Sequence, residues 1–378
     1  VQTCALPIFT LAIAAADINE LMAICEGALL GSYQFNQFKG GAARKTAAKK
    51  IVISPGRKIA NSANALKRVE TIINQVQLVR NLINMPPSYL TPEKFISLVK
   101  AELPASVKAT VKNHTQLKSE GYGGITAVGQ GSANPPRLLH LSYRPAKAKK
   151  KFAYIGKGIT FDTGGLALKP AQGMEAMKSD MSGAAAVVGA IIAIAELKLP
   201  VAIDAWAPLA ENMVSESSTR PSDVITIYGG KTVEVLNPDA EGRLILADAL
   251  VRAVEVTKDL DGIIDVATLT GAQIIALGKR TAAVMGNDEQ FRDRFLQAAK
   301  TVGENFWPMP LPEELRASLD SPTADIANIG ERMGGMLVAG LFLREFVPSE
   351  LPWLHLDIAG PSYNEDHPHG YTPVGGVG

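Results

Sequence analysis

The stretch SGAAAVVGAIIAIAELKLPVAIDAWAPLA, residues 182–210, joins two segments of different character. Residues 182–199 are rich in small apolar side chains over a length typical of a buried helix, whereas residues 201–210 form a short apolar run typical of a buried strand. The pattern continues on both sides, with strands predicted at 151–161, 262–271 and 352–360 and helices at 242–256 and 336–347. Such alternation predicts an α/β fold: a layered mixed, largely parallel sheet with helices on both faces.

Before this region the pattern is less regular. Residues 9–30 predict an amphipathic helix, and residues 41–60 predict a polar connection that contains one short strand, KIVIS. Residues 61–85 predict a long helix that stops before Pro86 and Pro87, because proline cannot continue a helix. We place a domain boundary after this helix.

The composition is that of a globular chain with little net charge. Of 378 residues, 47% are hydrophobic and 20% are charged, and the formal net charge is +1. A net charge this close to zero creates no electrostatic field that would attract nucleic acid or an anionic membrane. The basic cluster ARKTAAKK (43–50) is interpreted as a solvated loop. Cys4 and Cys25 are too few for a disulfide framework and too isolated for a zinc knuckle, so we expect a reducing, cytoplasmic compartment.

Membrane association is not expected. No apolar stretch is predicted to reach the roughly 18–20 residues that span a bilayer. Residues 1–17 resemble a signal peptide, but they lack a basic beginning and continue into a helical pattern, which favours a buried helix.

Several familiar catalytic motifs are missing from the sequence. There is no G-x-S-x-G, no H-E-x-x-H and no G-x-G-x-x-G after a strand, and GGKT (229–232) lacks the first glycine of a P-loop. The five histidines are scattered, apart from a pair near the end that is interpreted as solvated: His114, His140, His355, His367 and His369. These absences disfavour a histidine-based hydrolase and an ordinary zinc site.

Acids and lysines remain as candidates for chemistry, namely Lys157, Asp162, Lys169, Asp180, Asp239 and Glu241. Each alone has an ordinary explanation, such as a helix N-cap for Asp180, a turn for Asp162 and solvated surfaces for the lysines. Together, four carboxylates in apolar surroundings would repel one another unless cations lay among them. Two divalent cations would balance them, and oxygen ligands suit Mg²⁺, Mn²⁺ and also Zn²⁺. One lysine could then serve as a neutral ligand, while another, with Arg243, could stabilise an oxyanion.

NPDAEGRL (237–244) places Asp239, Glu241 and Arg243 at every second position. In a strand these side chains would share one face. At the start of a helix, Asp239 would instead be the N-cap of the apolar run that follows. The proposed cation cluster favours the strand or a loop, with the two acids side by side.

These motifs resemble the cytosolic leucyl aminopeptidase family, whose signature octapeptide is NTDAEGRL, with Pro238 here in place of threonine. GKGITFDTGGLALKP, MKSDMSGAAA, DVATLTGA and HLDIAGPSY resemble further segments of that family in the same order. The resemblance covers roughly residues 76–378. It implies an aminopeptidase-like catalytic domain and divides the chain into a remnant of a truncated N-terminal α/β domain (1–60), a linking helix (61–85) and a catalytic metallopeptidase domain (86–378).

The resemblance also implies roles for individual residues. Two divalent metal ions would be bound by Lys157, Asp162, Asp180, Asp239 and Glu241, with Asp162 and Glu241 bridging. Lys169 would polarise the scissile carbonyl, and Arg243 would hold a bicarbonate ion that acts as general base for the metal-bound water. The first residue of the substrate would contact Met177, Thr268, Leu269 and Gly271.

The implied function is removal of N-terminal, leucine-like residues from peptides by a cytoplasmic homohexamer. We expect Pro238 to be tolerated, because proline favours an extended residue before it. Two alternatives stay open: a catalytically impaired fragment of that enzyme, and an added DNA-binding or regulatory role, which the net charge supports little. A two-metal phosphatase or esterase is disfavoured by the lysine pattern.

Overall fold

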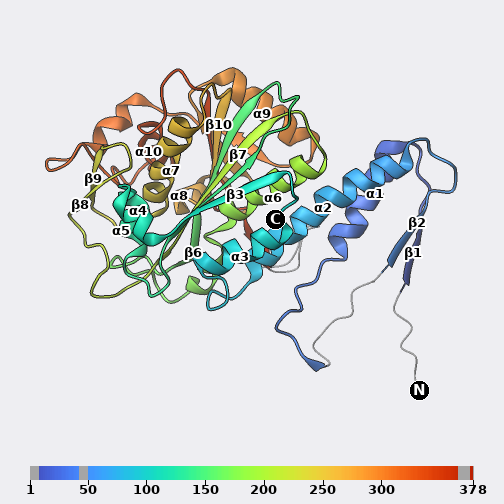
Figure 1. Ribbon diagram of the computed structural model, residues 1–378, viewed down its shortest axis with the longest axis horizontal. Coiled ribbons are helices and arrows are strands. Elements are labelled where there is room, and N and C mark those ends of the chain that lie inside the picture. Colours follow the sequence, from blue (N-terminus) through green and yellow to red (C-terminus); the bar gives the residue numbers. More distant parts are fainter. Residues whose placement is uncertain (1–7, 42–49, 365–374, 378) are drawn as a thin grey trace.

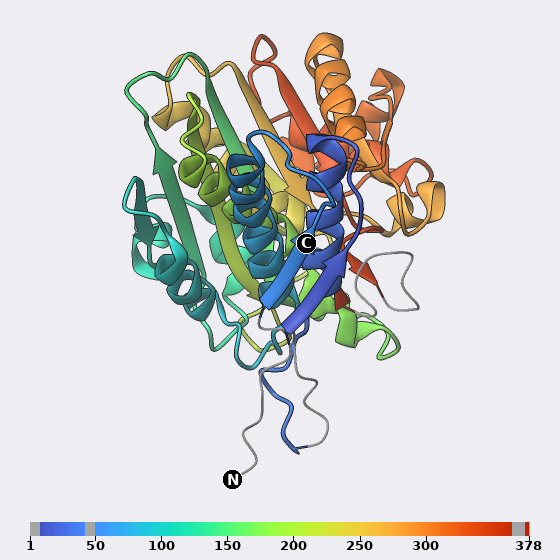
Figure 2. The same cartoon turned by 90° about the vertical axis from the view of Figure 1, so that its right-hand side faces the viewer.

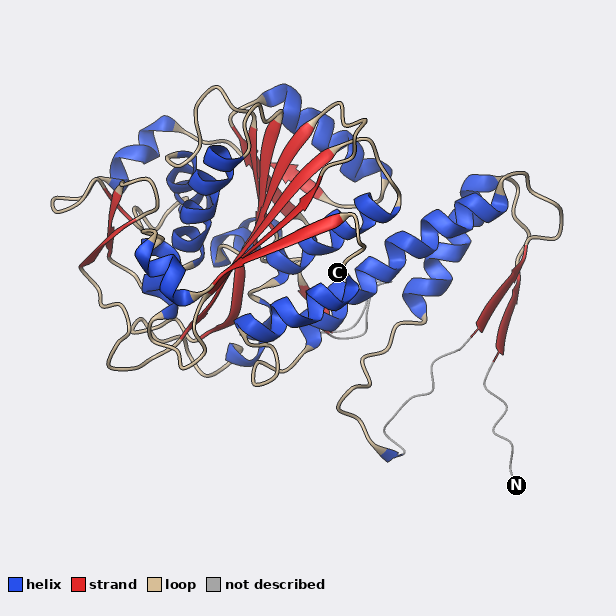
Figure 3. Cartoon of the chain, in the orientation of Figure 1, coloured by secondary structure: helices blue, strands red, loops and turns tan. Residues whose placement is uncertain are grey.

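The computed structural model describes residues 8–41, 50–364 and 375–377. Most of the basic cluster predicted as a loop at 43–50 lies outside the described residues, as do Cys4, His367 and His369. Figures 1 and 3 show a large body built around a twisted fan of strands, with a smaller group of N-terminal elements projecting from one side.

The main sheet contains nine strands within the described residues, in the order β12-β11-β14-β10-β5-β7-β4-β3, with β6 also pairing with β7. Its central strands β14, β10, β5 and β7 are parallel, whereas β11, β4 and β3 pair antiparallel with their neighbours. The bounds are β3 (Val107–Lys112), β4 (Arg137–Tyr143), β5 (Lys151–Gly156), β6 (Gly158–Asp162), β7 (Ala202–Asn212), β10 (Gly262–Ala267), β11 (Ala282–Gly286), β12 (Phe306–Pro308) and β14 (Trp353–Asp357). The predicted mixed, largely parallel sheet is confirmed.

Helices cover both faces of this sheet (Figure 3). On one face α6 packs on the central strands, α2 packs on the outer side of α6, and α3 packs on β4 and β7. On the other face α7 packs with α5 and α10. The bounds are α2 (Ser62–Asn84), α3 (Pro92–Glu102), α4 (His114–Ser119), α5 (Gly123–Gly129), α6 (Ser182–Glu196), α7 (Gly242–Val256), α8 (Gly271–Leu277), α9 (Glu289–Thr301) and α10 (Gly335–Arg344). Burial on both faces explains why β7 is buried along its whole length, as its apolar sequence predicted.

A small three-stranded sheet, β13-β9-β8, lies beside the main one. It consists of β8 (Asp223–Thr226), β9 (Thr232–Val235) and β13 (Ile326–Ala327), and β9 leads directly toward the NPDAEGRL segment. Further short elements are the 3₁₀ helices η2 (Met174–Ser179) and η3 (Glu313–Leu319), and the strands β15 (Tyr363–Asn364) and β16 (Gly375–Gly376).

The N-terminal elements differ in part from the prediction. Residues 9–30 were expected to form one helix, but β1 (Ile8–Ala12) is a strand and only α1 (Ile18–Gly31) is helical. β1 pairs in parallel with β2 (Lys50–Ser54), the predicted KIVIS strand, and this distant partner makes the first segment a strand. Figures 1 and 2 show that α2 joins these elements to the main body. The proposed division at residues 60 and 85 stays a prediction.

The segment Met174–Glu196 is apolar and long enough to cross a bilayer by length and composition alone. The prediction that no stretch reaches such a length was therefore wrong. In the structure, 72% of the most apolar window of this segment is buried within the protein. It comprises η2 and α6, which pack against the sheet and α2, as a core helix does.

Candidate metal centre

The predicted acids and lysines meet beyond the carboxyl ends of the parallel strands. Lys157 follows β5 directly, Asp162 is the last residue of β6, and Asp180 follows η2 directly, two residues before α6 begins. Asp239 and Glu241 lie in the connection between β9 and α7. In open α/β sheets, this edge is where ligands bind.

Lys157 lies at the centre of the cluster and is 3% exposed. Its Nζ is 2.8 Å from Asp180 Oδ1 and 2.9 Å from Glu241 Oε1, and it donates a hydrogen bond to the Thr268 carbonyl at 2.9 Å. The lysine side chain passes directly over Gly242, where an added Cβ would lie 2.6 Å from its Cε. Glycine at this position therefore leaves the space that Lys157 occupies.

Lys169 lies on the other side of the cluster and reaches two different acids. Its Nζ is 2.8 Å from Asp162 Oδ2, and it forms an ion pair with Asp239. The other carboxylate oxygen of Asp162 is also bonded: Oδ1 accepts hydrogen bonds at 2.8 Å from both the Gly164 backbone and the Asn212 side-chain amide. Gly164 has φ of +86°, a conformation that favours glycine.

Burial and charge dominate the electrostatics of the cluster. Burial raises the pKa of Asp162, Asp180 and Asp239, and the nearby Glu241 charge raises the pKa of Asp162 and Asp180 further. For Lys157 and Lys169 burial alone would lower the pKa, but the surrounding carboxylates raise it above the ordinary value. When all groups are ionised, the four carboxylates carry −4 and the two lysines +2, which leaves −2.

This arrangement fits divalent cations. Asp162, Asp239 and Glu241 each offer an oxygen atom, and these three atoms lie within 4.8 Å of one another. Two buried carboxylate oxygens of the cluster, Asp180 Oδ2 and Glu241 Oε2, accept no hydrogen bond from any described residue. A buried carboxylate oxygen without a partner is costly unless an ion supplies one. The charge deficit, the unpartnered oxygens and the oxygen-rich ligand set all favour hard or borderline cations.

Arg243 occupies the first turn of α7 and is 7% exposed. Its Nη1 donates to the Asn328 carbonyl at 2.8 Å, and its guanidinium carbon lies 5.9 Å from the centre of the Phe342 ring. Burial lowers the pKa of Arg243 to about 10, so the side chain stays charged at neutral pH. Its buried Nε has no acceptor among the described residues, which leaves a donor for an anion.

The NPDAEGRL segment is a turn followed by a helix. Asp239 N donates to Asn237 Oδ1 at 2.9 Å, Ala240 N donates to the Asn237 carbonyl at 3.0 Å, and α7 then begins at Gly242. The strand hypothesis is therefore wrong and the loop hypothesis is confirmed, since the N-cap of α7 is Glu241 and not Asp239. Pro238 lies at the second position of this turn, where its fixed φ is favourable.

Residues 77–378 match the model of the cytosol aminopeptidase family, catalytic domain. The chain belongs to the cytosol aminopeptidase family. It is 52% identical over 373 residues to a probable cytosol aminopeptidase of Streptomyces avermitilis, covering 97% of this chain and 72% of that protein.

Two solved structures of similar proteins support the cytosol aminopeptidase assignment. The bottromycin maturation enzyme BotP in complex with Mn has a TM-score of 0.89 and 37% identity, over 97% of this chain and 80% of that one. Cytosol aminopeptidase from Coxiella burnetii has a TM-score of 0.88 and 34% identity, over 99% of this chain and 79% of that one. The cytosol aminopeptidase family consists of metal-dependent aminopeptidases, so this chain belongs to a family of metallo-hydrolases.

Two of the four residues expected to contact the substrate, Thr268 and Met177, are hydrogen-bonded to Asp180 of the cluster. Thr268 is joined to it directly, since its Oγ1 donates to Asp180 Oδ1 at 2.7 Å. Leu269 is half-buried in the following segment, and Gly271 is exposed at the start of α8. Met177 lies in η2, and its carbonyl accepts a hydrogen bond from Asp180 N. Sequence reasoning did not identify Asp357, a buried acid that accepts from Leu269 N at 3.1 Å and from Thr270 Oγ1 at 2.7 Å.

Two asparagines near the acids were also missed. Asn212 ends β7 and donates to Asp162 Oδ1 and to the Pro238 carbonyl, at 2.8 and 3.1 Å. Asn328 follows β13 and contacts the turn that carries Asp239 and Glu241. A polar residue at the end of a buried strand would have marked Asn212. The strand was predicted to end at residue 210, two residues too early, so Asn212 was not considered.

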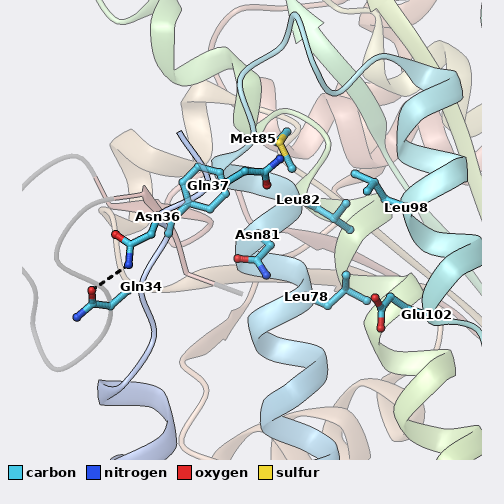
Figure 4. Close-up of a pocket in the computed structure, with 10 residues that line it drawn as sticks. Gln34, Asn36, Gln37, Leu78, Asn81, Leu82, Met85, Leu98 and Glu102 are labelled. Atoms are coloured by element: carbon cyan, nitrogen blue, oxygen red, sulfur yellow. Dashed lines mark hydrogen bonds between the residues drawn. The ribbon is translucent and has the colours of Figure 1, made fainter. Parts of the chain in front are cut away.

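A separate cavity of about 380 Å³ lies between the segment after α1 and helices α2 and α3 (Figure 4). Figure 4 shows Leu78, Leu82 and Leu98 on one side of it and the amides of Gln34 and Asn36, hydrogen-bonded at 3.3 Å, on the other. Of the described residues that line it, Glu102 alone is charged, and none is a predicted site residue. This cavity is therefore not the predicted metal centre.

Proposed function

We propose that this protein is a two-metal aminopeptidase that removes N-terminal, leucine-like residues from peptides. The observation that carries the proposal is the convergence of oxygens from Asp162, Asp239 and Glu241 within 4.8 Å, beside the unpartnered Asp180 Oδ2. Two divalent ions would be held by these four acids together with Lys157. Manganese and zinc, and also magnesium, suit this ligand set.

Lys157 and Lys169 would have different roles in this site. Bound cations would polarise the scissile carbonyl and supply a water of lowered pKa. Lys157 would give up its extra proton and become a nitrogen ligand because bound cations would replace its positive charge among the acids, and it would still donate to the Thr268 carbonyl. Lys169 has a side chain that is 20% exposed, which supports a position nearer the substrate, where it would stabilise the oxyanion that develops on the carbonyl.

Arg243 would hold a bicarbonate ion as the general base. A guanidinium binds a planar anion through paired hydrogen bonds, and the free Nε donor supports this role. The free α-amine of the substrate would bind at the metal centre, which restricts hydrolysis to the first residue. Met177, Thr268, Leu269 and Gly271 would contact that residue.

The same proposal includes the cellular state of the enzyme. We infer a cytoplasmic homohexamer, on the basis of family resemblance and of the names of its relatives as cytosol aminopeptidases. No feature of the described surface favours nucleic acid as a partner, and the net charge of +1 argues against it.

Metal removal tests the function. The purified protein is assayed with leucine p-nitroanilide, treated with a chelator, and assayed again after addition of Mn²⁺ or Zn²⁺. We expect chelation to abolish hydrolysis and either ion to restore it, because the acids alone provide no nucleophile of suitable pKa.

A blocked substrate is the matched control for this assay. N-acetyl-leucine p-nitroanilide has the same scissile bond but no free α-amine, and we expect no hydrolysis of it. Activity that survives chelation, or equal activity on the blocked substrate, would show that the protein is not a metal-dependent aminopeptidase.

A further inference from the structure

Asn328 is a fully buried asparagine that contacts both ends of the loop carrying two of the proposed ligands. We call residues 236–241 the ligand loop, because Asp239 and Glu241 lie in it. Asn328 comes from a segment about 90 residues further along the chain, directly after β13.

The side-chain amide of Asn328 makes four hydrogen bonds to the backbone of this loop. Its Oδ1 accepts from Leu236 N at 2.8 Å and from Asn237 N at 3.1 Å. Its Nδ2 donates to the Asn237 carbonyl at 2.7 Å and, more weakly, to the Ala240 carbonyl at 3.4 Å. All the hydrogen-bonding capacity of the amide is thus directed at the loop.

The backbone of Asn328 holds the next basic residue. Its carbonyl accepts the 2.8 Å hydrogen bond from Arg243 Nη1, and its N–H donates to the Glu234 carbonyl at 2.9 Å. β13 runs parallel to β9, with Ala327 opposite Glu234, so Asn328 emerges where the chain leaves β9 for the ligand loop. One residue therefore links the strand before the loop, the loop and Arg243.

We propose that Asn328 is a positioning residue for the metal centre, which fixes the course of the ligand loop and the orientation of the Arg243 guanidinium. This inference rests on the proposed two-metal aminopeptidase function. Only a side chain with one acceptor and two donors on the same planar group makes all four contacts; alanine makes none, and ionised aspartate lacks both donors. The residue acts through Asp239, Glu241 and Arg243 and does not itself bind metal or substrate.

The test compares Asn328→Ala and Asn328→Asp with the wild-type enzyme. We expect the affinity for Mn²⁺, measured by calorimetry on metal-free protein, to fall about 10- to 100-fold in both variants, as it does when partners of metal ligands are removed. We expect kcat to fall more than KM rises, because misplaced reacting groups slow the chemical step. Hydrogen exchange at the Leu236 and Asn237 amides should accelerate in the alanine variant, since their acceptor is gone. The aspartate of Asn328→Asp has the same shape as the natural side chain. If the alanine variant does not fold, Mn²⁺ affinity and kcat are measured on this variant instead.

Asn287→Ala is the matched control. Asn287 follows β11 and, unlike Asn328, is exposed, but its amide also bonds to backbone groups, with Oδ1 accepting from Trp353 N at 2.8 Å and Nδ2 donating to the Leu351 carbonyl at 2.9 Å. It holds a different loop, at the opposite end of the sheet from the acids. We expect Asn287→Ala to leave kcat and Mn²⁺ affinity unchanged and the ligand-loop amides protected.

The possible outcomes separate this inference from the proposed function. If the wild type shows metal-dependent hydrolysis but both Asn328 variants match Asn287→Ala in Mn²⁺ affinity and kcat, the positioning role is overturned and the function stands. If the wild type shows no metal-dependent hydrolysis, the proposed function fails. In that case unchanged exchange at Leu236 and Asn237 in Asn328→Ala would overturn the positioning role as well.

Discussion

Replacing Glu241 by glutamine is expected to lower the kcat/KM for leucine p-nitroanilide by about 10²–10³-fold or more, since a group that stabilises charge at a buried reaction centre contributes this much. Glu241 is 2% exposed, pairs with Lys157 through one oxygen, and presents the other without a partner. Glutamine keeps the volume and the burial but loses the charge that would bind a cation. The measurement is steady-state hydrolysis at saturating Mn²⁺.

Glu211→Gln is the control for this substitution. Glu211 is a glutamate of similar burial at the same end of the sheet, and its carboxylate accepts hydrogen bonds from Ser132 and Asn134. It is not a member of the group of three converging acids. We expect this variant to retain wild-type kcat/KM. A Glu241→Gln enzyme with wild-type activity would contradict the role given to Glu241.

Replacing Lys169 by methionine is expected to lower kcat by about 10²–10³-fold with little change in KM, because the ammonium acts mainly on charge that develops in the transition state. Methionine keeps the unbranched chain of lysine without its terminal ammonium, so the charge and the donors are lost. Unlike Glu241→Gln, this variant should bind Mn²⁺ at least as tightly as the wild type, since a cation that competes for Asp162 and Asp239 is gone.

Lys178→Met is the corresponding control. Lys178 is half-buried nearby, but it donates to the Asn84 carbonyl at 3.2 Å and lies over the Tyr363 ring, and no ion pair joins it to the four acids. Activity in Lys178→Met should stay at the wild-type level. If Lys169→Met kept its kcat, or lost Mn²⁺ binding, Lys169 would not be the oxyanion-stabilising group.

Local patterns were sufficient to predict the parallel centre of the main sheet, β5, β7, β10 and β14, but not its outer strands β3, β4, β11 and β12. The helix predicted at 242–256 is observed as Gly242–Val256, and the long helix predicted at 61–85 is observed as Ser62–Asn84. Both have clear boundaries in the sequence, such as Pro86 after the second. The first strand was missed because the apolar run at residues 8–12 suits either structure, and its partner β2 begins at Lys50.

The candidate site could be predicted as a set of residues but not as a geometry. Because clustered acids need cations to balance their charge, Asp162, Asp180, Asp239 and Glu241 could be predicted to share one site. In the structure, ion pairs with Lys157 and Lys169 connect these four acids. Asn328 could not be found in this way. Its position follows from the pairing of β13 with β9, two short strands about 90 residues apart, and no local pattern marks such a contact.

The most direct measurement of the central claim is the number of Mn²⁺ ions bound per chain, by titration of the metal-free protein in a calorimeter with elemental analysis of the saturated sample. A two-metal centre predicts two ions for the wild type and fewer for Glu241→Gln, together with release of protons as ligands with raised pKa values are occupied. Saturation at one ion or none, with full activity on leucine p-nitroanilide, would contradict the two-metal account.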